Sequence, residues 1–193
     1  MALVRKNSGK NSGGLFPPRS PSRAVDPEAL WDGLRGKRAL VVGFTARTGL
    51  SAALVFHRRG IKVSVSDSKP EAELAPLRKR LPDPAIPFFC GPQGPEQLAR
   101  VDFVLLSPGV PRNLPLVEAA VRRGMPVYND VDFIAPFIAD KQLAGVTGTD
   151  GKSTVTELLA HVLAAGGVSV ACGNNGVPVF EAYGRLREAR YVV

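Results

Sequence analysis

The sequence lacks long apolar runs, a secretory leader and any cysteine framework. No stretch of about 18 or more uninterrupted apolar residues occurs, so we expect no membrane-spanning helix. Residues 1–21 contain no apolar core of the kind found in signal peptides, which favours a cytoplasmic protein that has no membrane partner. The two cysteines, Cys90 and Cys172, are far apart and belong to no paired-cysteine motif, which argues against a disulfide framework or a structural zinc site.

Acidic residues are fewer than basic ones, 17 against 25, and the formal net charge is +8. Much of the excess lies near the N-terminus, where Asp26 is the first acid and the chain is rich in Ser, Gly, Asn and Pro. We therefore predict a disordered basic tail over residues 1–35, with an anion-binding arm as the alternative. The rest of the chain shows no alternation of bases with aromatics, so nucleic acid is not expected as a partner.

Short apolar strands alternate with amphipathic helices from Lys37 onward. The predicted strands cover residues 38–42, 61–66, 86–89, 102–106 and 126–128, and the predicted helices cover 51–59, 71–80 and 114–123. This alternation predicts parallel βαβ units in a doubly wound, mostly parallel, Rossmann-like α/β domain over residues 36–140. An apolar, helix-like segment at 131–140 then leads into a new strand at 142–146. A second α/β unit is therefore predicted over residues 141–193.

A glycine-rich loop lies between the strand and the helix that open this second unit. Its sequence is Thr147-Gly148-Thr149-Asp150-Gly151-Lys152-Ser153-Thr154. Glycines let backbone N–H groups surround phosphate oxygens, Lys152 can reach the outer phosphates, and the Ser153 hydroxyl can ligate Mg²⁺. The loop therefore predicts ATP binding by Gly148 to Thr154, with Lys152 as a catalytic residue and Ser153 as a metal ligand.

Parts of this loop have alternative interpretations. A strict Walker loop has glycine where this chain has Val146, so the match is to the shorter Gly-x-x-Gly-Lys-Ser form. The alternative is a glycine-rich turn whose lysine is merely exposed. Asp150 either orients a hydrated metal ion or caps its own turn. His161 lies off the apolar stripe of the following helix, and we expect it to face solvent.

A second nucleotide-like turn, Gly43 to Gly49, follows the first strand, and Asp67 ends the next one. The Gly-x-Gly-x-x-Gly spacing of dinucleotide-binding proteins is absent, so an NAD-dependent enzyme is the weaker alternative. A single nucleotide-linked ligand fits better, with its pyrophosphate near Thr48 and Asp67 as a hydrogen-bond acceptor. A simple turn acid is the other interpretation of Asp67.

Two later turns also follow strands. They are Ser107-Pro108-Gly109, after an apolar strand, and Gly173 to Pro178, which contains Asn174. Open α/β sheets bind ligands outside the carboxyl ends of their strands. Each turn is unremarkable by itself, but both stand where ligand contacts are expected.

Taken in order, these motifs resemble the D-glutamate-adding branch of the Mur ligase family over roughly residues 36–193. The residues that carry the resemblance are Thr48-Gly49-Leu50-Ser51, Asp67, Ser107-Pro108-Gly109, Gly148 to Thr154, and Gly173-Asn174 with Pro178. The resemblance implies a UDP-substrate-binding, Rossmann-like domain over residues 36–140. It also implies that residues 141–193 are the first, incomplete part of a P-loop ATP-binding domain.

The family reaction joins D-glutamate to UDP-N-acetylmuramoyl-L-alanine in peptidoglycan biosynthesis, with ATP and Mg²⁺. ATP phosphorylates the terminal carboxylate of the substrate, and the amine of D-glutamate then attacks the acyl phosphate. By resemblance the UDP-sugar contacts are Arg47, Thr48, Asp67, Ser68, Ser107, Pro108, Gly109 and Asn174. The resemblance further implies a monomeric, cytoplasmic ligase.

The chain departs from the family pattern at two places. The turn after the first strand has one residue more than usual, within Thr45-Ala46-Arg47, so its UDP contacts are expected to differ. Residues 188–193 resemble the approach to the strand after which such ligases present a magnesium-binding glutamate. The catalytic glutamate, histidine and lysine and the C-terminal domain are therefore expected beyond Val193, and we expect this chain alone to be inactive. A non-catalytic UDP-sugar-binding module and another Mur or folylpolyglutamate-type ligase are the alternatives.

Overall fold

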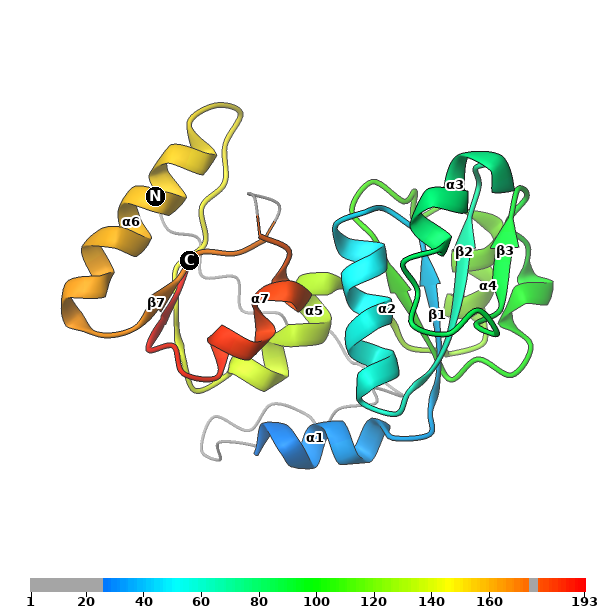
Figure 1. Ribbon diagram of the computed structural model, residues 1–193, viewed down its shortest axis with the longest axis horizontal. Coiled ribbons are helices and arrows are strands. Elements are labelled where there is room, and N and C mark those ends of the chain that lie inside the picture. Colours follow the sequence, from blue (N-terminus) through cyan, green and yellow to red (C-terminus); the bar gives the residue numbers. More distant parts are fainter. Residues whose placement is uncertain (1–25, 174–176) are drawn as a thin grey trace.

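Five parallel strands form the main sheet of the protein. The structure is a computed structural model that describes residues 26–173 and 177–193. In chain order the strands are β1 (Arg38–Val42), β2 (Lys62–Asp67), β3 (Phe88–Cys90), β4 (Phe103–Leu106) and β5 (Val127–Asn129). Across the sheet their order is β3-β2-β1-β4-β5 (Figure 1). The predicted doubly wound, mostly parallel fold is therefore confirmed. The order reverses between β1 and β4, where such sheets bind ligands.

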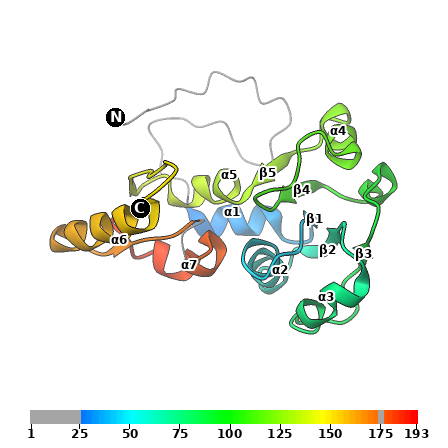
Figure 2. The same ribbon diagram turned by 90° about the horizontal axis from the view of Figure 1, so that it is seen from above.

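Helices cover both faces of this sheet. They are α2 (Thr48–Arg58), α3 (Glu71–Arg78), the 3₁₀ turn η1 (Pro95–Leu98), α4 (Pro115–Arg122) and α5 (Asp130–Ile134), which continues as the 3₁₀ turn η2 (Ala135–Ile138). Viewed from above, α2 and α3 lie on one side of the sheet and α4 on the other (Figure 2). Alternate residues of the central strand, such as Val41 and Val42, belong to the two separate cores. Because both faces are covered, β4 is apolar throughout and β1 is apolar after Arg38.

An ion pair ties the beginnings of β1 and β4 together. The Asp102 carboxylate accepts from the backbone N–H of Arg38 at 2.8 Å and from its guanidinium at 2.7 and 3.1 Å. These hydrogen bonds hold the pKa of Asp102 below its ordinary value. The contact links β1 and β4 at their amino ends. The ligand-binding edge lies at the opposite, carboxyl ends of the same two strands.

A helix, α1 (Pro27–Leu34), occupies part of the segment that we expected to be a disordered tail over residues 1–35. The expectation is wrong for this part. Asp26 caps the helix by accepting from the Glu28 N–H, and Leu30, Trp31 and Leu34 are buried. Apolar residues at this spacing form one helical face, which the basic composition of the preceding residues concealed. Residues 1–25 lie outside the described part of the chain.

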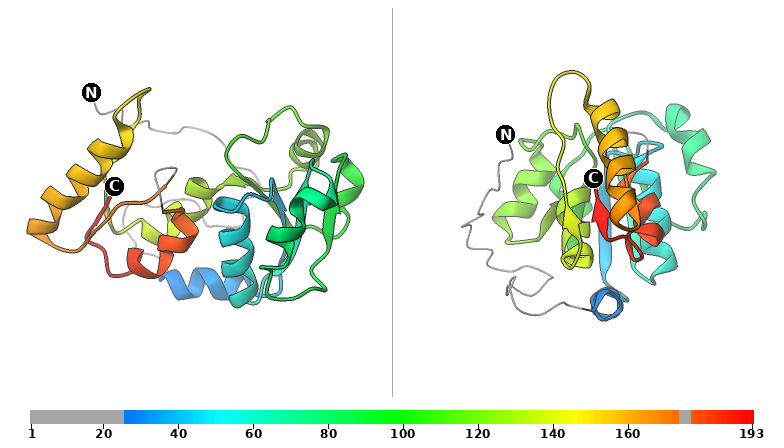
Figure 3. Two further views of the ribbon diagram at one scale, coloured as in Figure 1. Left: turned by 45° about the horizontal axis from the view of Figure 1, so that its top comes forward. Right: turned by 90° about the vertical axis from the view of Figure 1, so that its left-hand side faces the viewer.

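A smaller parallel sheet follows the first one. Its strands are β6 (Gln142–Leu143), β7 (Ser169–Val170) and β8 (Tyr191–Val192), in the order β6-β8-β7. The strand predicted at 142–146 is thus two residues long, and the Ala144 N–H, which donates to the Val192 carbonyl at 2.8 Å, continues the pairing by one hydrogen bond. Helix α6 (Lys152–Leu163) and the 3₁₀ turn η3 (Ala164–Gly166) connect β6 to β7, and α7 (Val179–Leu186) leads to β8. Figure 3 shows α6 at the outer end of the molecule.

A continuous aromatic core joins the two sheets. Helix α7 packs against α2 and α5, and α1 runs beneath them (Figure 1). Phe133 of α5 lies at the centre, with its ring centroid 4.9 Å from that of Phe56 and 5.7 Å from that of Phe180. At the edge of this core, the Trp31 indole N–H donates to the Tyr183 hydroxyl at 2.8 Å. Helix α1 therefore fastens α7 to the first domain.

No helix within residues 26–173 or 177–193 is both long and apolar enough to cross a membrane.

Candidate functional site

The turn after β1 packs tightly against the loop after β4. Gly43 has φ of +84°, and a Cβ there would lie 2.7 Å from Cγ2 of Val110 and 3.1 Å from Cβ of Ser107. The Ser107 hydroxyl donates to the Gly43 carbonyl at 2.5 Å. Only glycine satisfies both the left-handed conformation and the close approach. The predicted Gly43 turn and the predicted Ser107 loop thus form one structure at the carboxyl edge of the sheet.

Helix α2 begins directly against this turn. A Cβ on Gly49 would lie 2.5 Å from the carbonyl oxygen of Gly43 and 2.8 Å from Cα of Phe44. The Leu50 N–H donates to the Thr45 carbonyl at 3.0 Å, and the Gly49 N–H donates to the Thr45 hydroxyl at 3.4 Å. The longer turn therefore folds back on the helix and satisfies two of the backbone donors at its start. This arrangement gives the extra residue of the turn a structural role.

Asp67 braces the same turn from the end of β2. Its buried carboxylate accepts from the Phe44 N–H at 2.6 Å and from the Lys69 N–H at 2.9 Å. The turn-acid interpretation thus describes the contacts present in the structure. Ser68, the next residue, is exposed at the same edge. Asp67 positions the turn. The exposed Ser68 hydroxyl is the group of this pair that a ligand could contact.

A buried carboxylate that sequence reasoning missed lies next to Thr48. The Thr48 hydroxyl is 3.5 Å from Oδ2 of Asp130, the first residue of α5, and both side chains are buried. Burial raises the pKa of Asp130, although the Val131 N–H donates to its carboxylate and opposes the shift. Arg47, just before α2, is exposed. The predicted residue Thr48 therefore links the starts of α2 and α5.

A groove of about 230 Å³ opens between the ends of β4 and β5. The predicted residues Ser107, Pro108 and Gly109 line one side, and Arg112 and Asn129 also line the groove. The Asn129 side chain caps α5 by accepting from the Asp132 N–H at 2.7 Å. Sequence reasoning missed Arg112 and Asn129. The signal for Asn129 was available, since it directly follows a predicted strand at the ligand-binding edge.

The glycine-rich loop stands exposed between β6 and α6. Gly151 immediately precedes the helix and has φ of +71°. This left-handed conformation at the start of the helix favours glycine. The Lys152 ammonium donates to the Thr149 carbonyl at 2.9 Å. Ser153 and Thr154 occupy the first turn of α6, at the positive end of its dipole. Gly148, Asp150 and His161 are exposed, which confirms the expectation for His161.

The loop and the first site face the same side of the molecule. Strands of both sheets run in the same general direction, so the turn into α2 and the loop into α6 both lie at the top of Figure 1. Asn174, the predicted contact to the muramoyl portion, lies outside the described residues. Among the residues that are described, no three His, Cys, Asp or Glu side chains cluster as a metal site.

Residues 37–129, which contain the turn, Asp67 and the groove, match the family model of the Mur ligase MurD-like N-terminal domain. The chain carries a MurD-like N-terminal domain. Curated relatives include UDP-N-acetylmuramoylalanine–D-glutamate ligases from Koribacter versatilis, 38% identical over 75% of this chain and 32% of that protein, and from Solibacter usitatus, 40% identical over 76% and 31%. The ligase of Bdellovibrio bacteriovorus is 35% identical over 83% of this chain and 34% of its own. The chain thus spans about a third of the length of these relatives.

Two solved structures that are similar to this chain are Mur ligases. UDP-N-acetylmuramate-alanine ligase MurC from Thermotoga maritima has a TM-score of 0.43 and 29% identity, over 66% of this chain and 29% of that one. A UDP-N-acetylmuramate:L-alanyl-gamma-D-glutamyl-meso-diaminopimelate ligase from Neisseria meningitides has a TM-score of 0.47 and 23% identity, over 74% and 44%.

Proposed function

We propose that this chain is the UDP-substrate-binding and ATP-binding part of a UDP-N-acetylmuramoyl-L-alanine:D-glutamate ligase of peptidoglycan biosynthesis. The observation that carries the proposal is the carboxyl edge of the MurD-like domain, where the Gly43 turn, the Ser107 loop and the groove beside Asn129 meet. This edge is the topological switch point of the sheet, where α/β folds bind nucleotide-linked ligands.

In this proposal the groove and the start of α2 hold the UDP-sugar. Ser107 to Gly109 line the groove, and Ser68, Thr48 and Arg47 stand at neighbouring strand and helix ends. Arg112, exposed at the same groove, adds a guanidinium that suits a pyrophosphate. Because the Thr45 oxygens already accept from the Gly49 and Leu50 N–H groups of α2, the pyrophosphate would depend on side chains more than on helix amides.

The second unit would hold Mg-ATP. The exposed loop has the features that phosphate binding needs: Gly151 with a left-handed backbone, a helix N-terminus, and an exposed Lys152 whose ammonium donates to the Thr149 carbonyl. The Ser153 hydroxyl is the residue of this loop that would ligate Mg²⁺, and the ion would neutralise phosphate charge. In the completed reaction the substrate carboxylate takes the γ-phosphoryl group of ATP. The amine of D-glutamate then displaces phosphate to form the amide.

Calorimetry on the full chain tests both halves of the proposal. We expect UDP-N-acetylmuramoyl-L-alanine and Mg-ATP each to bind. Lys152→Ala should weaken Mg-ATP binding by about tenfold or more, since a charge-assisted contact contributes roughly 1.5–3 kcal/mol. It should leave binding of the UDP-linked substrate unchanged. Lys79→Ala, which removes an exposed lysine near α3, is the matched control and should change neither affinity.

The second candidate function is a non-catalytic UDP-sugar-binding module. The observation in its favour is that α6 buries only Thr156 and Ala160, so the helix that follows the glycine-rich loop is held by little packing. Binding of the UDP-linked substrate without any binding of Mg-ATP would support the module instead. Failure of both ligands to bind would refute both functions.

A further inference from the structure

A cavity of about 600 Å³ lies between α2 and α7, away from the groove of the candidate site. Leu50, Leu54 and Val55 of α2 and Phe180 of α7 give it apolar walls. The two helices pack side by side in Figure 1, with α3 on the far side of α2. The cavity shares no lining residue with the groove at β4 and β5. A volume of this size falls in the range of small-molecule binding sites.

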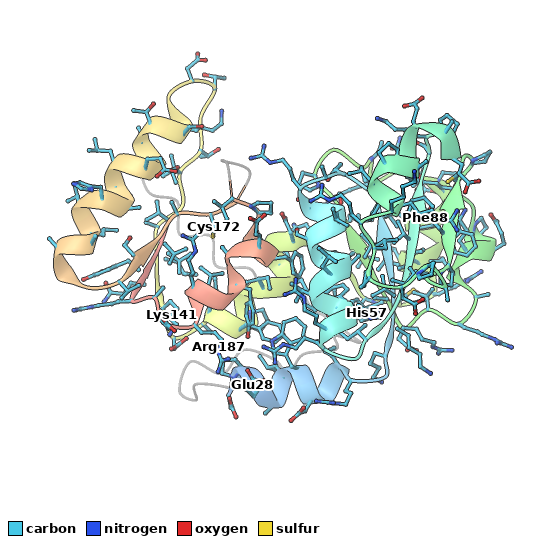
Figure 4. All side chains as sticks on the ribbon, viewed as in Figure 1. Glu28, His57, Phe88, Lys141, Cys172 and Arg187 are labelled. Carbon is cyan, nitrogen blue, oxygen red and sulfur yellow. The ribbon has the colours of Figure 1, made fainter. Side chains whose placement is uncertain are left out.

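The polar part of the lining is dominated by guanidinium groups. Arg58, Arg59 and Arg80 line the cavity, against a single acid, Glu181. Arg59 is already satisfied: its guanidinium lies 2.6 Å from the Glu28 carboxylate and 5.1 Å from the ring centroid of Trp31. Figure 4 shows Glu28 and Arg187 together below this region, and they form an ion pair at 3.2 Å.

Arg58 and Arg80 differ from Arg59 in their partners. Within the described part of the chain neither forms an ion pair with a carboxylate, and Arg58 makes only a 3.3 Å hydrogen bond to the Leu54 carbonyl of its own helix. Arg58 and Arg80 could pair with the anionic head group of an amphiphilic ligand, and the apolar wall could contact its body. Arginine is the residue type best suited to carboxylate and phosphate groups, because its planar fork donates two parallel hydrogen bonds.

We propose that the cavity between α2 and α7 binds a small organic anion that has an apolar body. Its carboxylate or phosphate head group would pair with Arg58 and Arg80, and its body would lie against Leu50, Leu54 and Phe180. Such a ligand contacts the MurD-like domain through α2 and the second unit through α7. It therefore stabilises the docked arrangement of the two parts and raises the unfolding temperature as its concentration increases.

Two anionic probes and one neutral probe, titrated into the full chain by calorimetry, test the proposal. 2-Naphthoate and 2-naphthyl phosphate carry the two head groups on one apolar body, and 2-naphthamide carries no charge. We expect at least one anion to bind at least tenfold more tightly than 2-naphthamide. The tighter of the two anions identifies the head group.

Two variants locate the binding site. Arg58→Ser/Arg80→Ser should weaken anion binding by about tenfold or more, whereas Arg122→Ser/Arg123→Ser, which removes two exposed arginines near the end of α4, should not. Gly184→Leu should fill the cavity and abolish binding. A Cβ at Gly184 meets nothing within 4 Å, and leucine favours the helix more than glycine does. Gly33→Leu in α1, equally unobstructed, is its control.

Three results would overturn the proposal: no binding of either anion, equal binding of 2-naphthamide, or binding that either cavity variant leaves unchanged. Separate titrations with Mg-ATP and the UDP-linked substrate distinguish this outcome from the proposed function, because Arg58, Arg80 and Gly184 are assigned to neither ligand.

Discussion

At the residue scale, the site depends on two glycines, because a side chain at either position would collide with its neighbours. Gly43 and Gly49 let the turn after β1, the Ser107 loop and the first turn of α2 approach within contact distance of one another. The obstacle to a side chain at Gly49 is backbone, at 2.5 Å from a Cβ, and backbone cannot rotate away. The geometry of this edge is thus set by close main-chain packing, and small changes in side-chain volume should disturb it.

Gly49→Ala should destabilise the protein by about 1–3 kcal/mol, the usual cost of overpacking. Urea denaturation measures the difference. Gly33→Ala is the matched control, since its Cβ meets nothing within 4 Å and it also lies in a helix. That control should stabilise the protein by about 0.5–1 kcal/mol. Equal stabilities of Gly49→Ala and the unsubstituted protein would show that the turn has room to move.

Asp130 should make stability depend on pH. Burial raises its pKa in the folded protein, so the ionised carboxylate is disfavoured there relative to the unfolded chain. Its favourable contribution is complete below the unfolded pKa of about 3.9 and is lost as pH rises through the folded value. Asp130→Asn removes the charge; its one carbonyl oxygen still accepts from the Val131 N–H, and its NH₂ group can donate to the Thr48 hydroxyl. The variant should gain stability relative to the original protein as pH increases.

Urea denaturation from pH 3 to pH 7 checks this expectation. Asp32→Asn is the control, because Asp32 is exposed and forms an ion pair with the neighbouring exposed Arg35. Its effect should be small at every pH, as for other surface ion pairs. A constant difference between Asp130→Asn and the original protein across the range would count against a raised pKa.

At the element scale, α1 depends on tertiary contacts for its stability. Eight residues are too few for a stable isolated helix in water, so burial of Leu30, Trp31 and Leu34 must supply most of its stability. The ring centroids of Trp31 and Phe137 are 4.5 Å apart in a tilted arrangement, and the indole N–H donates to the Tyr183 hydroxyl. One short helix thereby fastens α7 and η2, which belong to different parts of the chain.

Tyr183→Phe should cost about 1–3 kcal/mol of stability, because it leaves the buried Trp31 N–H without its acceptor. Trp31 is the single tryptophan of the chain, so its fluorescence reports directly on the docking of α1. Tyr191→Phe, in β8 and outside the cluster around Trp31, is the control. An unchanged emission maximum together with unchanged stability in Tyr183→Phe would show that the hydrogen bond is dispensable.

At the scale of the whole molecule, burial is uneven. Phe133 is fully buried and touches rings from α1, α2, β4 and α7. On α6, by contrast, the apolar residues Val155, Leu158 and Val162 are 50%, 61% and 60% exposed. They follow one face of the helix at the spacing of a buried stripe. These three residues form an apolar helix face that is exposed to solvent. Exposed apolar patches of this kind promote association between protein molecules.

Leu158→Gln/Val162→Gln should therefore change the free energy of unfolding by less than about 0.5 kcal/mol, whereas Phe133→Ala should cost about 3–5 kcal/mol. Urea denaturation measures both. Sedimentation should also show that the α6 variant associates less than the unsubstituted protein at high concentration. A loss of stability comparable to that of Phe133→Ala would mean that the stripe is packed in solution.

Much of the fold could be predicted because its signals are local. Strand β1, α4 and β5 appear close to their predicted bounds, since alternating apolar residues and glycine stops act over a few positions. The errors lie where distant contacts decide. Helix α1 was assigned to a disordered tail because its partners, Phe137 and Tyr183, are more than a hundred residues away. For the same reason Asp130 was absent from the predicted site, since its partner Thr48 is 82 residues away. Asn129, by contrast, directly follows a predicted strand and could have been included.

The sequence by itself determined the alternation of strands and helices, the positions of the two glycine-bearing loops and the family of the N-terminal domain, because periodicity and turn chemistry operate between near neighbours. Only the tertiary structure decided what the residues of those loops do. It assigned Asp67 and the Thr45 oxygens to bracing the turn and left Ser68 and Arg112 exposed. It also placed three arginines around a cavity between α2 and α7. Such roles depend on which backbone donors and side chains meet after the sheet has folded. The separation of two residues along the chain does not determine how far apart they lie in the folded protein.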